Sequence, residues 1–399
     1  MPDPITTINN NEMYSILQDA TNQILGADAI ENITLQDIVD TGSKWDFSKK
    51  EQWVKELTAR RIRTMYTDAS YKDKRNDVFF TDSAEFGAVL QLISMEMPDI
   101  IENRSWTKFG TGGVTEIGVN TVYLPIVDEQ LYAGTDSWGV SIAYTGTQLD
   151  AAFNSVSELK QFDNYVKLMA ENAIELHRAT MNGINRNNYM AEKIHLGNSV
   201  GKINVINLVE EYQRDHNNSP MTRPQFFSSP DAMRYTVKTF AKYKSMLKDM
   251  TTLFTTKADS KGLFIPENRF VMQVLADFEG RMDAEVYSTT YHDEFVKLDG
   301  YRRVNAWQAL VGTTNADFST LSKIDVTTAD GNIVSKDGIV GIMVDKWAIM
   351  HTMVQKRVGY QRDDIKDISM YDYQFTDRYI NNLRLNGIVF VVDDYTPST

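Results

Sequence analysis

The chain has 399 residues, of which 42% are hydrophobic, 11% aromatic and 24% charged. Single cores stop growing at roughly 250 to 300 residues, so two domains are expected, and this composition excludes wholesale disorder. The net charge of -13 argues against nucleic acid as a tight ligand, and the absence of cysteine excludes disulfides, thiolate catalysis and Cys-ligated zinc.

The first residues, Met-Pro-Asp-Pro-Ile, lack the basic start and the apolar run of a signal peptide. No later stretch approaches about 18 consecutive apolar residues, the length that indicates a membrane-spanning helix. We therefore expect a soluble protein that is not exported, does not bind a membrane and suits a reducing cytoplasm.

Residues 1–80 are polar and are interrupted by short apolar clusters, one of which contains Trp45, Phe47, Trp53 and Leu57. None of these clusters is large enough to fold alone. Two interpretations remain open: an ordinary first helical layer, or an arm whose apolar side chains pack on another subunit.

The next segment, 83–97, is predicted to be a helix. Asp82 and Glu85 form a capping-box-like pair, apolar side chains recur at helical spacing, and Pro98 stops the element.

Between residues 107 and 147 the apolar residues alternate. One limb runs from Ile117 to Tyr123 and the other from Val140 to Tyr144, which predicts a long hairpin with one apolar face. A lone hairpin is marginal in water, so it must pack on something else. The glycines near its base and turn are predicted to be flexible joints: Gly110, Gly112, Gly113, Gly134 and Gly139.

The clearest predicted helix starts at Ser155, where Ser155 and Glu158 form a capping box. Apolar side chains then recur at three- and four-residue steps as far as Met181, which predicts roughly 27 residues of amphipathic rod. Gly183 and the asparagine-rich stretch 182–188 are expected to weaken its continuation, with a resumption of the helix at Tyr189, Met190 and Ile194 left open.

The remaining elements follow from local patterns. We predict helices at 203–213 and from Ser229-Pro230 onward, an acidic turn at 276–286, and a polar loop or domain crossing at 312–337. Short apolar runs predict strands at 270–275, 339–344 and 388–392.

No motif predicts chemistry. The histidines never stand at the i, i+4 spacing of a metal site on a helix, and no phosphate-binding glycine loop occurs. The Asp363/Asp364 and Asp393/Asp394 pairs are interpreted as solvated loop charge. The stripe of Arg234, Lys238 and Lys242 is interpreted as a solvated helix face, with contact to DNA or to an acidic protein as the alternative. We expect no catalytic, cofactor or metal site, and no enzyme.

Roughly the last 60 residues contain Ile339-Val-Gly-Ile-Met-Val-Asp-Lys-Trp347, then Arg357, then Phe375, then Arg384-Leu-Asn-Gly-Ile-Val-Phe-Val-Val392. This segment resembles the closing segment of the major capsid proteins of tailed bacteriophages. In that family a strand ends in an Asp-containing turn beside an aromatic residue, an arginine follows, and an Arg-x-Asp/Asn-Gly turn leads into the final strand. The matching positions are Asp345, Trp347, Arg357, Arg384, Asn386 and Gly387. The likeness extends over roughly residues 80 to 395 in element order and is strongest to shell proteins of small short-tailed phages of Gram-positive hosts.

The resemblance implies an α+β fold of the Hong Kong ninety-seven type. Its expected parts are an N-terminal arm at 1–80, a peripheral domain at 81–106, an extended hairpin loop at 107–149, a spine helix with more of the peripheral domain at 150–200, an inserted axial domain at 201–335, and the rest of the peripheral domain at 336–399.

The resemblance also implies the function. The chain would assemble with itself, as pentamers and hexamers, into the icosahedral head shell around a double-stranded DNA genome. A scaffolding protein and a portal protein would be partners, DNA would be touched only weakly, and the protein would be in the virion after assembly in the host cytoplasm. A phage tail or adhesion protein, or a soluble hydrolase, remains an alternative.

In this interpretation, segments 1–80 and 107–147 bury their nonpolar sides mainly against other copies of the chain. The predicted assembly contacts are Trp45, Trp53, Lys108, Tyr123, Trp138, Arg357 and Arg384. Lys108 lies near the hairpin base, but no partner for a covalent cross-link stands out, and none is predicted.

Overall fold

The computed structural model describes residues 44–45, 48–53, 79–81, 90–95, 127–145, 156–257, 262–287, 300–308, 316–363, 366 and 368–397. The chain divides into two compact units. Unit 1 comprises Met1–Glu85, Thr135–Ile184 and His351–Tyr379, and unit 2 comprises Phe86–Gly134, Asn185–Met350 and Ile380–Thr399. Helix α5 (Val156–Leu196) and strands β11 (Ile349–Asp363) and β12 (Ile368–Asn381) contribute residues to both.

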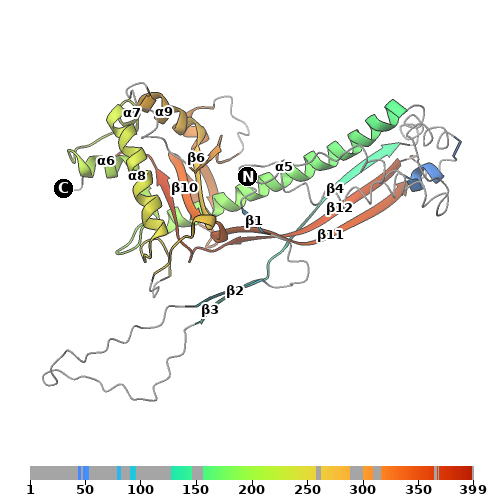
Figure 1. Cartoon of the computed structure of the whole chain (residues 1–399), viewed down its shortest axis with the longest axis horizontal. Helices are drawn as coiled ribbons and strands as arrows, with labels where there is room; N and C mark the ends of the chain where they lie inside the picture. The colour runs from blue at the N-terminus through green and yellow to red at the C-terminus, as the bar shows by residue number, and fades with distance from the viewer. Residues whose placement is uncertain are drawn as a thin grey trace, which may run out of the picture. The chain divides into compact units, whose positions relative to one another are not determined.

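Unit 1 is built on a four-stranded sheet in the order β1 (Phe80–Thr81), β11, β12 and β4 (Asp136–Thr145). Strand β4 pairs antiparallel with β12 along its whole length, from Asp136 opposite Asp377 to Thr145 opposite Ile368. Figure 1 shows these long strands side by side. Because alternate side chains of a strand face opposite ways, β4 presents Trp138, Val140, Ile142 and Tyr144 on one face. Ile142 and Tyr144 are buried, so this face belongs to the core of unit 1.

The first part of α5 packs on that same face. Ala170, Ile174 and Arg178 recur every four residues and are buried, as the amphipathic pattern predicts. The ring of His177 lies 4.2 Å from that of Trp138, and the guanidinium of Arg178 lies 5.2 Å from the ring of Phe375 on β12. Unit 1 is therefore a sheet with α5 on its apolar face.

Unit 2 contains a five-stranded sheet in the order β5 (Val205–Asn207), β13 (Gly387–Val391), β10 (Ile339–Asp345), β6 (Phe270–Leu275) and β7 (Arg302–Val304). The central strand β10 is buried at every position, which explains its unbroken apolar sequence. Two further pairs of strands are β2 (Leu90–Met95) with β3 (Val127–Tyr132), and β8 (Ile324–Thr327) with β9 (Ile333–Lys336).

The helices of unit 2 are α6 (Leu208–Asp215), α7 (Arg223–Phe227), α8 (Pro230–Lys248), α9 (Ala276–Tyr287) and α10 (Phe318–Leu321). Single 3₁₀ turns occur at η3 (Glu267–Arg269) and η5 (Lys346–Ala348). Phe240 of α8 packs between the helices and the sheet. The centre of its ring lies 4.8 Å from that of Phe390 on β13 and 6.4 Å from that of Phe278 on α9. Figure 1 shows α8 and α9 beside β10 and β6.

Several predicted elements are confirmed. Strands β6, β10 and β13 match the predicted runs at 270–275, 339–344 and 388–392 within a residue at each end. Helix α8 begins as predicted, because the side chain of Ser229 accepts a hydrogen bond from the amide of Ala232 and Pro230 occupies the first turn.

The predicted helix at 83–97 is wrong over the residues that the structure describes. Leu90–Met95 forms strand β2, which pairs antiparallel with β3 from Leu90 opposite Tyr132 to Met95 opposite Val127. The sequence Leu-Gln-Leu-Ile-Ser-Met follows neither a helical nor a two-residue period throughout, and the pairing with β3 decides the conformation.

The predicted long hairpin is also corrected. Residues 140–144 belong to β4 and pair with β12, whereas residues 127–132 form β3 and pair with β2. Residues 117–123 lie outside the described part of the chain. We name the antiparallel pair of β2 and β3 the β2–β3 ribbon.

Helix α5 has 41 residues, so the expected weakening near Gly183 is wrong. Two of the asparagines there are buried and bonded: Asn185 donates to the carbonyl of Met350 at 3.2 Å, and Asn187 donates to that of Trp307 at 2.7 Å. Tertiary hydrogen bonds thus outweigh the low helix propensity of this stretch.

Three other local predictions are wrong in part. The acidic turn at 276–286 is helix α9, the region 312–337 contains α10, β8 and β9, and the helix at 203–213 is the short strand β5 followed by α6. Helix α9 carries Asp277 and Glu279 in its first turn, where the helix dipole favours acidic side chains.

Candidate assembly surfaces

The inner face of the β2–β3 ribbon is fixed to the body of unit 2 by charge. Both carboxylate oxygens of Asp128 accept from one guanidinium nitrogen of Arg384, at 2.9 and 3.0 Å, and Lys257 lies 3.3 Å from the same carboxylate. Asn382 donates to the side chain of Gln130 at 2.6 Å. Burial alone would raise the pKa of Asp128, but hydrogen bonds from Arg384 and Lys257 and their charges hold it below its ordinary value.

The outer face of the ribbon carries the side chains of Gln91, Ile93, Val127, Glu129 and Leu131. Its three aliphatic side chains are exposed by 57%, 51% and 63%, in the order Ile93, Val127 and Leu131. Gln91 donates to Glu129 across the ribbon at 2.6 Å. A strand pair with one face on its own unit and an apolar face in solvent is typical of a contact with another protein.

The turn from β12 to β13 holds Arg384 in position. The side chain of Thr255 donates to the carbonyl of Arg384, and the side chain of Asn386 donates to the carbonyl of Leu263 at 2.8 Å. A Cβ added at Gly387 would lie 2.3 Å from the hydroxyl of Tyr189, so only glycine fits there. The Arg-x-Asn-Gly turn is therefore a packed feature of unit 2.

The turn after β10 presents Trp347. The carboxylate of buried Asp345 accepts from the amide of Trp347 at 2.9 Å and caps η5. The same carboxylate forms two hydrogen bonds with Arg269, one of them at 3.0 Å, and the guanidinium of Arg269 lies 3.9 Å from the centre of the Trp347 ring. Trp347 remains 44% exposed.

In unit 1, the predicted contact residue Trp138 lies at a buried polar cluster. Its indole nitrogen donates to Asp377 at 2.7 Å, and His351 lies 3.2 Å from the same carboxylate oxygen. The side chains of Asp377 and His351 are fully buried. Burial lowers the pKa of His351, as does the nearby charge of Arg178, while Asp377 opposes the change.

Trp45 and Trp53 are buried within unit 1. Close to Trp53 in sequence, Glu51 accepts from Arg362 at 2.6 Å and from Ser369 at 2.6 Å, which ties this segment to β11 and β12. The tryptophans thus contribute to the core of their own unit, and a role as exposed contacts for another copy does not fit their burial.

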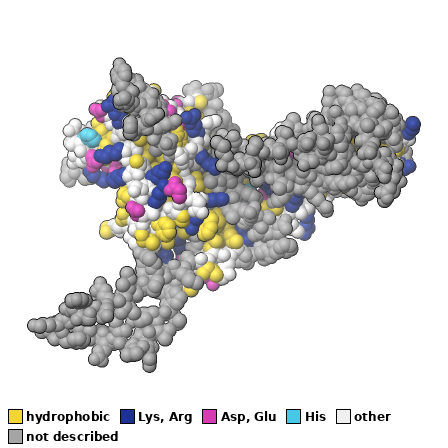
Figure 2. All heavy atoms as spheres, in the orientation of Figure 1, with side chains coloured by type: hydrophobic (Ala, Val, Ile, Leu, Met, Phe, Trp, Pro, Cys, Tyr) yellow, Lys and Arg dark blue, Asp and Glu magenta, His cyan; other side chains and the backbone are white. Residues whose placement is uncertain are grey.

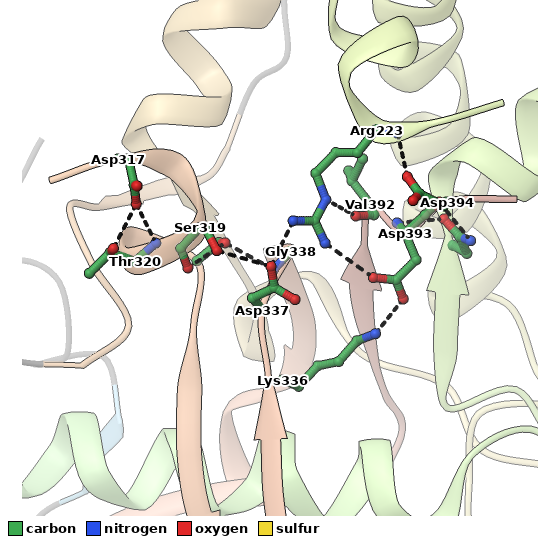
Figure 3. A network of polar contacts seen from close by, with 12 residues as sticks. Arg223, Asp317, Ser319, Thr320, Lys336, Asp337, Gly338, Val392, Asp393 and Asp394 are labelled. Carbon is green, nitrogen blue, oxygen red and sulfur yellow. Dashed lines mark hydrogen bonds and ion pairs between the residues drawn. The ribbon is translucent and has the colours of Figure 1, made fainter. Parts of the chain in front are cut away.

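A third polar network fixes the C-terminal segment of unit 2 (Figure 3). Arg223 donates to the carbonyl of Val392 and to Asp337, each at 2.7 Å, and Lys336 pairs with Asp393 at 2.5 Å. Gly338 has φ +78° and lies against Arg223, so both the backbone and the space require glycine. Asp393, which the sequence predicts to be a solvated loop charge, instead forms ion pairs with Lys336 at the end of β9 and with Arg223 of α7.

The remaining predicted residues divide by location. Arg357 is exposed on β11, and its role in assembly stays a prediction. Gly134 lies between β3 and β4 with no atom near its Cβ position, and Gly139 lies inside β4, where a Cβ would be 3.1 Å from the carbonyl of Tyr373. Gly139 is therefore a packing position in a paired strand. Lys108, Tyr123, Gly110, Gly112 and Gly113 lie outside the described residues.

The basic stripe of α8 is paired locally. Arg234 contacts Asp231 at 3.4 Å, Lys242 contacts Glu211 at 3.0 Å, and Lys238 lies over the ring of Tyr235. These contacts agree with the solvated-face interpretation.

Sequence reasoning missed Asp128, Lys257 and Arg269. Their partners are distant in the chain, and no spacing rule connects Asp128 with Arg384 or Arg269 with Asp345. Among the described residues, no group of three or more His, Asp or Glu side chains is arranged to hold a metal ion. Within that same part of the chain, no helix combines the length and apolar character needed to cross a membrane.

Comparison with solved structures identifies the fold. The chain is similar to a chain in the capsid structure of Staphylococcus phage Andhra, with a TM-score of 0.51 and 7% identity over 81% of this chain and 84% of that one. Lower TM-scores relate it to a structure of the head fiber and inner core protein of bacteriophage P68 (0.48; 8% identity; 78% and 83% covered) and to the capsid of Cyanophage P-SCSP1u (0.44; 9%; 80% and 87%).

No protein-family model matches the chain, and no curated protein matches it in sequence. The likeness to the chain in the Andhra capsid structure covers most of both molecules, and this chain itself combines helices and sheets. The chain therefore has the α+β fold of a bacteriophage capsid subunit, as its closing segment predicted.

Proposed function

We propose that this chain is a major capsid protein, which assembles with copies of itself into the icosahedral head shell of a tailed bacteriophage and encloses its double-stranded DNA. The observation that carries the proposal is the fold shared with the Andhra capsid chain over 81% of this chain. A shell subunit needs surfaces for other copies rather than a catalytic centre, so we propose a structural role and no enzymatic one.

The exposed surfaces support this role. The outer face of the β2–β3 ribbon leaves three large aliphatic side chains in solvent while its inner face is fixed by Asp128 and Gln130. Figure 2 shows hydrophobic side chains lying uncovered among basic and acidic ones on the visible face of unit 2. Burial of such a face stabilises a contact by about 25 cal/mol per Å² of apolar area. A shell repeats the same contact between many copies, so the stabilisation adds up.

The partners follow from the same proposal. Rings of five and six copies would share heterologous contacts, and Gly134 would absorb differences in angle between β3 and β4. A scaffolding protein and a portal protein are the further partners we propose, with assembly in the bacterial cytoplasm and a final place in the virion. The net charge of -13 is consistent with a shell that binds the packaged DNA only weakly, because negative surfaces repel phosphate groups.

Electron microscopy of the purified protein, alone and co-expressed with its neighbouring head genes, tests the proposal. We expect rings or closed shells of several sizes, which form more readily with a scaffolding protein. A tail protein would give tubes or rings of one fixed size, and a hydrolase a small defined oligomer. Either outcome would overturn the proposed function.

A further inference from the structure

An exposed aromatic side chain surrounded by cations lies on unit 2. We name it the Trp347 patch and define it by Lys244, Lys248, Arg269, Lys346 and Trp347. Arg269 stacks on Trp347, and Lys244 and Lys248 of α8 lie over the ring of Phe270, at 5.8 and 5.7 Å. Phe270 pairs with Asp345 across β6 and β10, and Lys346 stands between Asp345 and Trp347 in the chain.

Arg269 and Trp347 of the patch are held in place by Asp345. Asp345 is buried, binds Arg269 through two hydrogen bonds and caps the turn that carries Trp347. An indole fixed by a stacked and hydrogen-bonded guanidinium loses little conformational entropy when a partner covers it. Tryptophan and arginine are also enriched among the residues that dominate binding energy at interfaces.

The charge of the patch is opposite to that of the chain. Four of its five residues are basic. Buried Asp345 binds Arg269, and Glu267 pairs with Lys248. Each copy carries a net charge of -13, so copies repel one another on average. A cationic patch is where an acidic partner is favoured.

The outer face of the β2–β3 ribbon has the complementary character. It presents aliphatic side chains around Glu129, which can meet an exposed indole and nearby cations. We infer that the Trp347 patch of one copy receives the outer face of the β2–β3 ribbon of a second copy. Trp347 packs between Ile93 and Leu131, and Glu129 pairs with Lys346. This inference rests on the proposed self-assembly and names the two surfaces that meet.

A charge exchange tests the pairing. Assembly of the wild type is compared with that of Glu129→Lys, Lys346→Glu and the double variant, by light scattering over a range of protein concentration and by electron microscopy. Each single variant should raise the concentration at which assembly begins about tenfold or more, and the double variant should recover most of that loss. Trp347→Ala should raise it at least as much as either single variant.

Two controls separate assembly from folding. Ile333 is 79% exposed on β9 of the same unit, so Ile333→Ser should leave the assembly concentration unchanged. Thermal unfolding of the unassembled subunits should be the same for wild type, Lys346→Glu and Glu129→Lys.

The outcomes are distinct. If the single variants weaken assembly and the double variant does not recover, the ribbon is not the occupant. If the Trp347 and Lys346 variants assemble like wild type but lose affinity for a double-stranded DNA fragment, the patch binds nucleic acid and the inference is wrong. If wild type itself never assembles under any condition, the proposed function fails instead.

Discussion

Strands β3 and β4 are close in sequence, but large apolar side chains of β4 are buried whereas the aliphatic side chains of β3 are exposed. In β4, Ile142 and Tyr144 are buried by unit 1 itself, whereas in β3, Val127 and Leu131 remain more than half exposed. The burial of side chains alternates along both strands, although only β4 also alternates in sequence. Alternation alone shows that the two faces of a strand differ, but does not say whether the surface that covers an apolar face belongs to the same copy or to another.

The contrast corrects, for β4, the expectation that segment 107–147 buries its nonpolar side mainly against other copies. Strand β4 completes its own subunit, and among the described residues of that segment it is β3, paired with β2, that offers an uncovered apolar face. Folding stability and assembly should thus depend on different residues of one short stretch. The following predictions test that separation, from the largest expected effect to the smallest.

The largest effect is expected at Asp377 on the buried side. Asp377→Ala leaves Trp138 and His351 without their shared acceptor in a dry environment, and should lower the free energy of unfolding by about 3–5 kcal/mol. Asp372→Ala, on the same strand but at a more exposed position beside Ser141, should change it by about 0.5 kcal/mol or less. Chemical denaturation of unassembled subunits measures both. Equal losses would contradict the assignment of the Asp377 cluster to the core.

Ile142 and Leu131 form the matched pair for the comparison itself. Ile142→Ala should cost about 2–5 kcal/mol of folding stability because it leaves a cavity beneath β4. Leu131→Ala should cost about 0.5 kcal/mol or less, but should raise the concentration needed for assembly. Denaturation curves and light scattering on the same preparations distinguish the two. The reverse pattern would show that β3, not β4, is packed by its own chain.

The buried histidine predicts how unit 1 responds to acid. The pKa of His351 is lower in the folded chain than its ordinary value of 6.5, because burial disfavours the charged ring. Below pH 6.5 the unfolded chain takes up a proton on His351 more readily than the folded chain does. The contribution of the neutral ring to the free energy of unfolding is therefore fully present above pH 6.5 and is lost as the pH falls below that value.

Denaturation at pH values from 7.5 to about 5 checks this sign. The wild type should lose stability faster than His351→Gln, by at most about 1.4 kcal/mol per pH unit for a single proton. Identical slopes for the two proteins would mean that His351 does not titrate as described.

Only a small effect on folding is expected at the ribbon base. Arg384 is half exposed, so Arg384→Ala should lower the free energy of unfolding by only about 1 kcal/mol or less. Its main consequence should be a less firmly held ribbon. Hydrogen exchange of the amides in β2 and β3 should become faster, while that of β10 should be unchanged. No difference in the ribbon would show that Asp128 and Arg384 do not hold it.

The sequence predicted the parts of this fold that local patterns specify. The Ser229-Pro230 start of α8 and the buried runs of β6, β10 and β13 follow from capping and hydrophobicity, which act over a few residues. The resemblance of the closing segment supplied the fold. Asp345, Arg384 and Gly387 are indeed structural positions, and their burial and contacts explain the need for those residue types.

Other features could not be predicted because they depend on distant partners. The continuation of α5 through its asparagines needs the carbonyls of Met350 and Trp307, and the strand at 90–95 needs β3. The Asp128–Arg384 and Arg269–Asp345 pairs join residues 256 and 76 positions apart. Neither propensity nor spacing in one sequence reports such contacts.

Thiol labelling of the β2–β3 ribbon tests most directly whether folding and assembly use different surfaces of the chain. The chain has no cysteine, so a single Leu131→Cys substitution gives a unique thiol on the outer face of the ribbon. We predict rapid maleimide labelling of unassembled subunits and at least about tenfold slower labelling after assembly, since another copy covers this face. The Ile333→Cys variant, exposed on β9, should label equally in both states. Equal labelling at residue 131 before and after assembly would contradict the account.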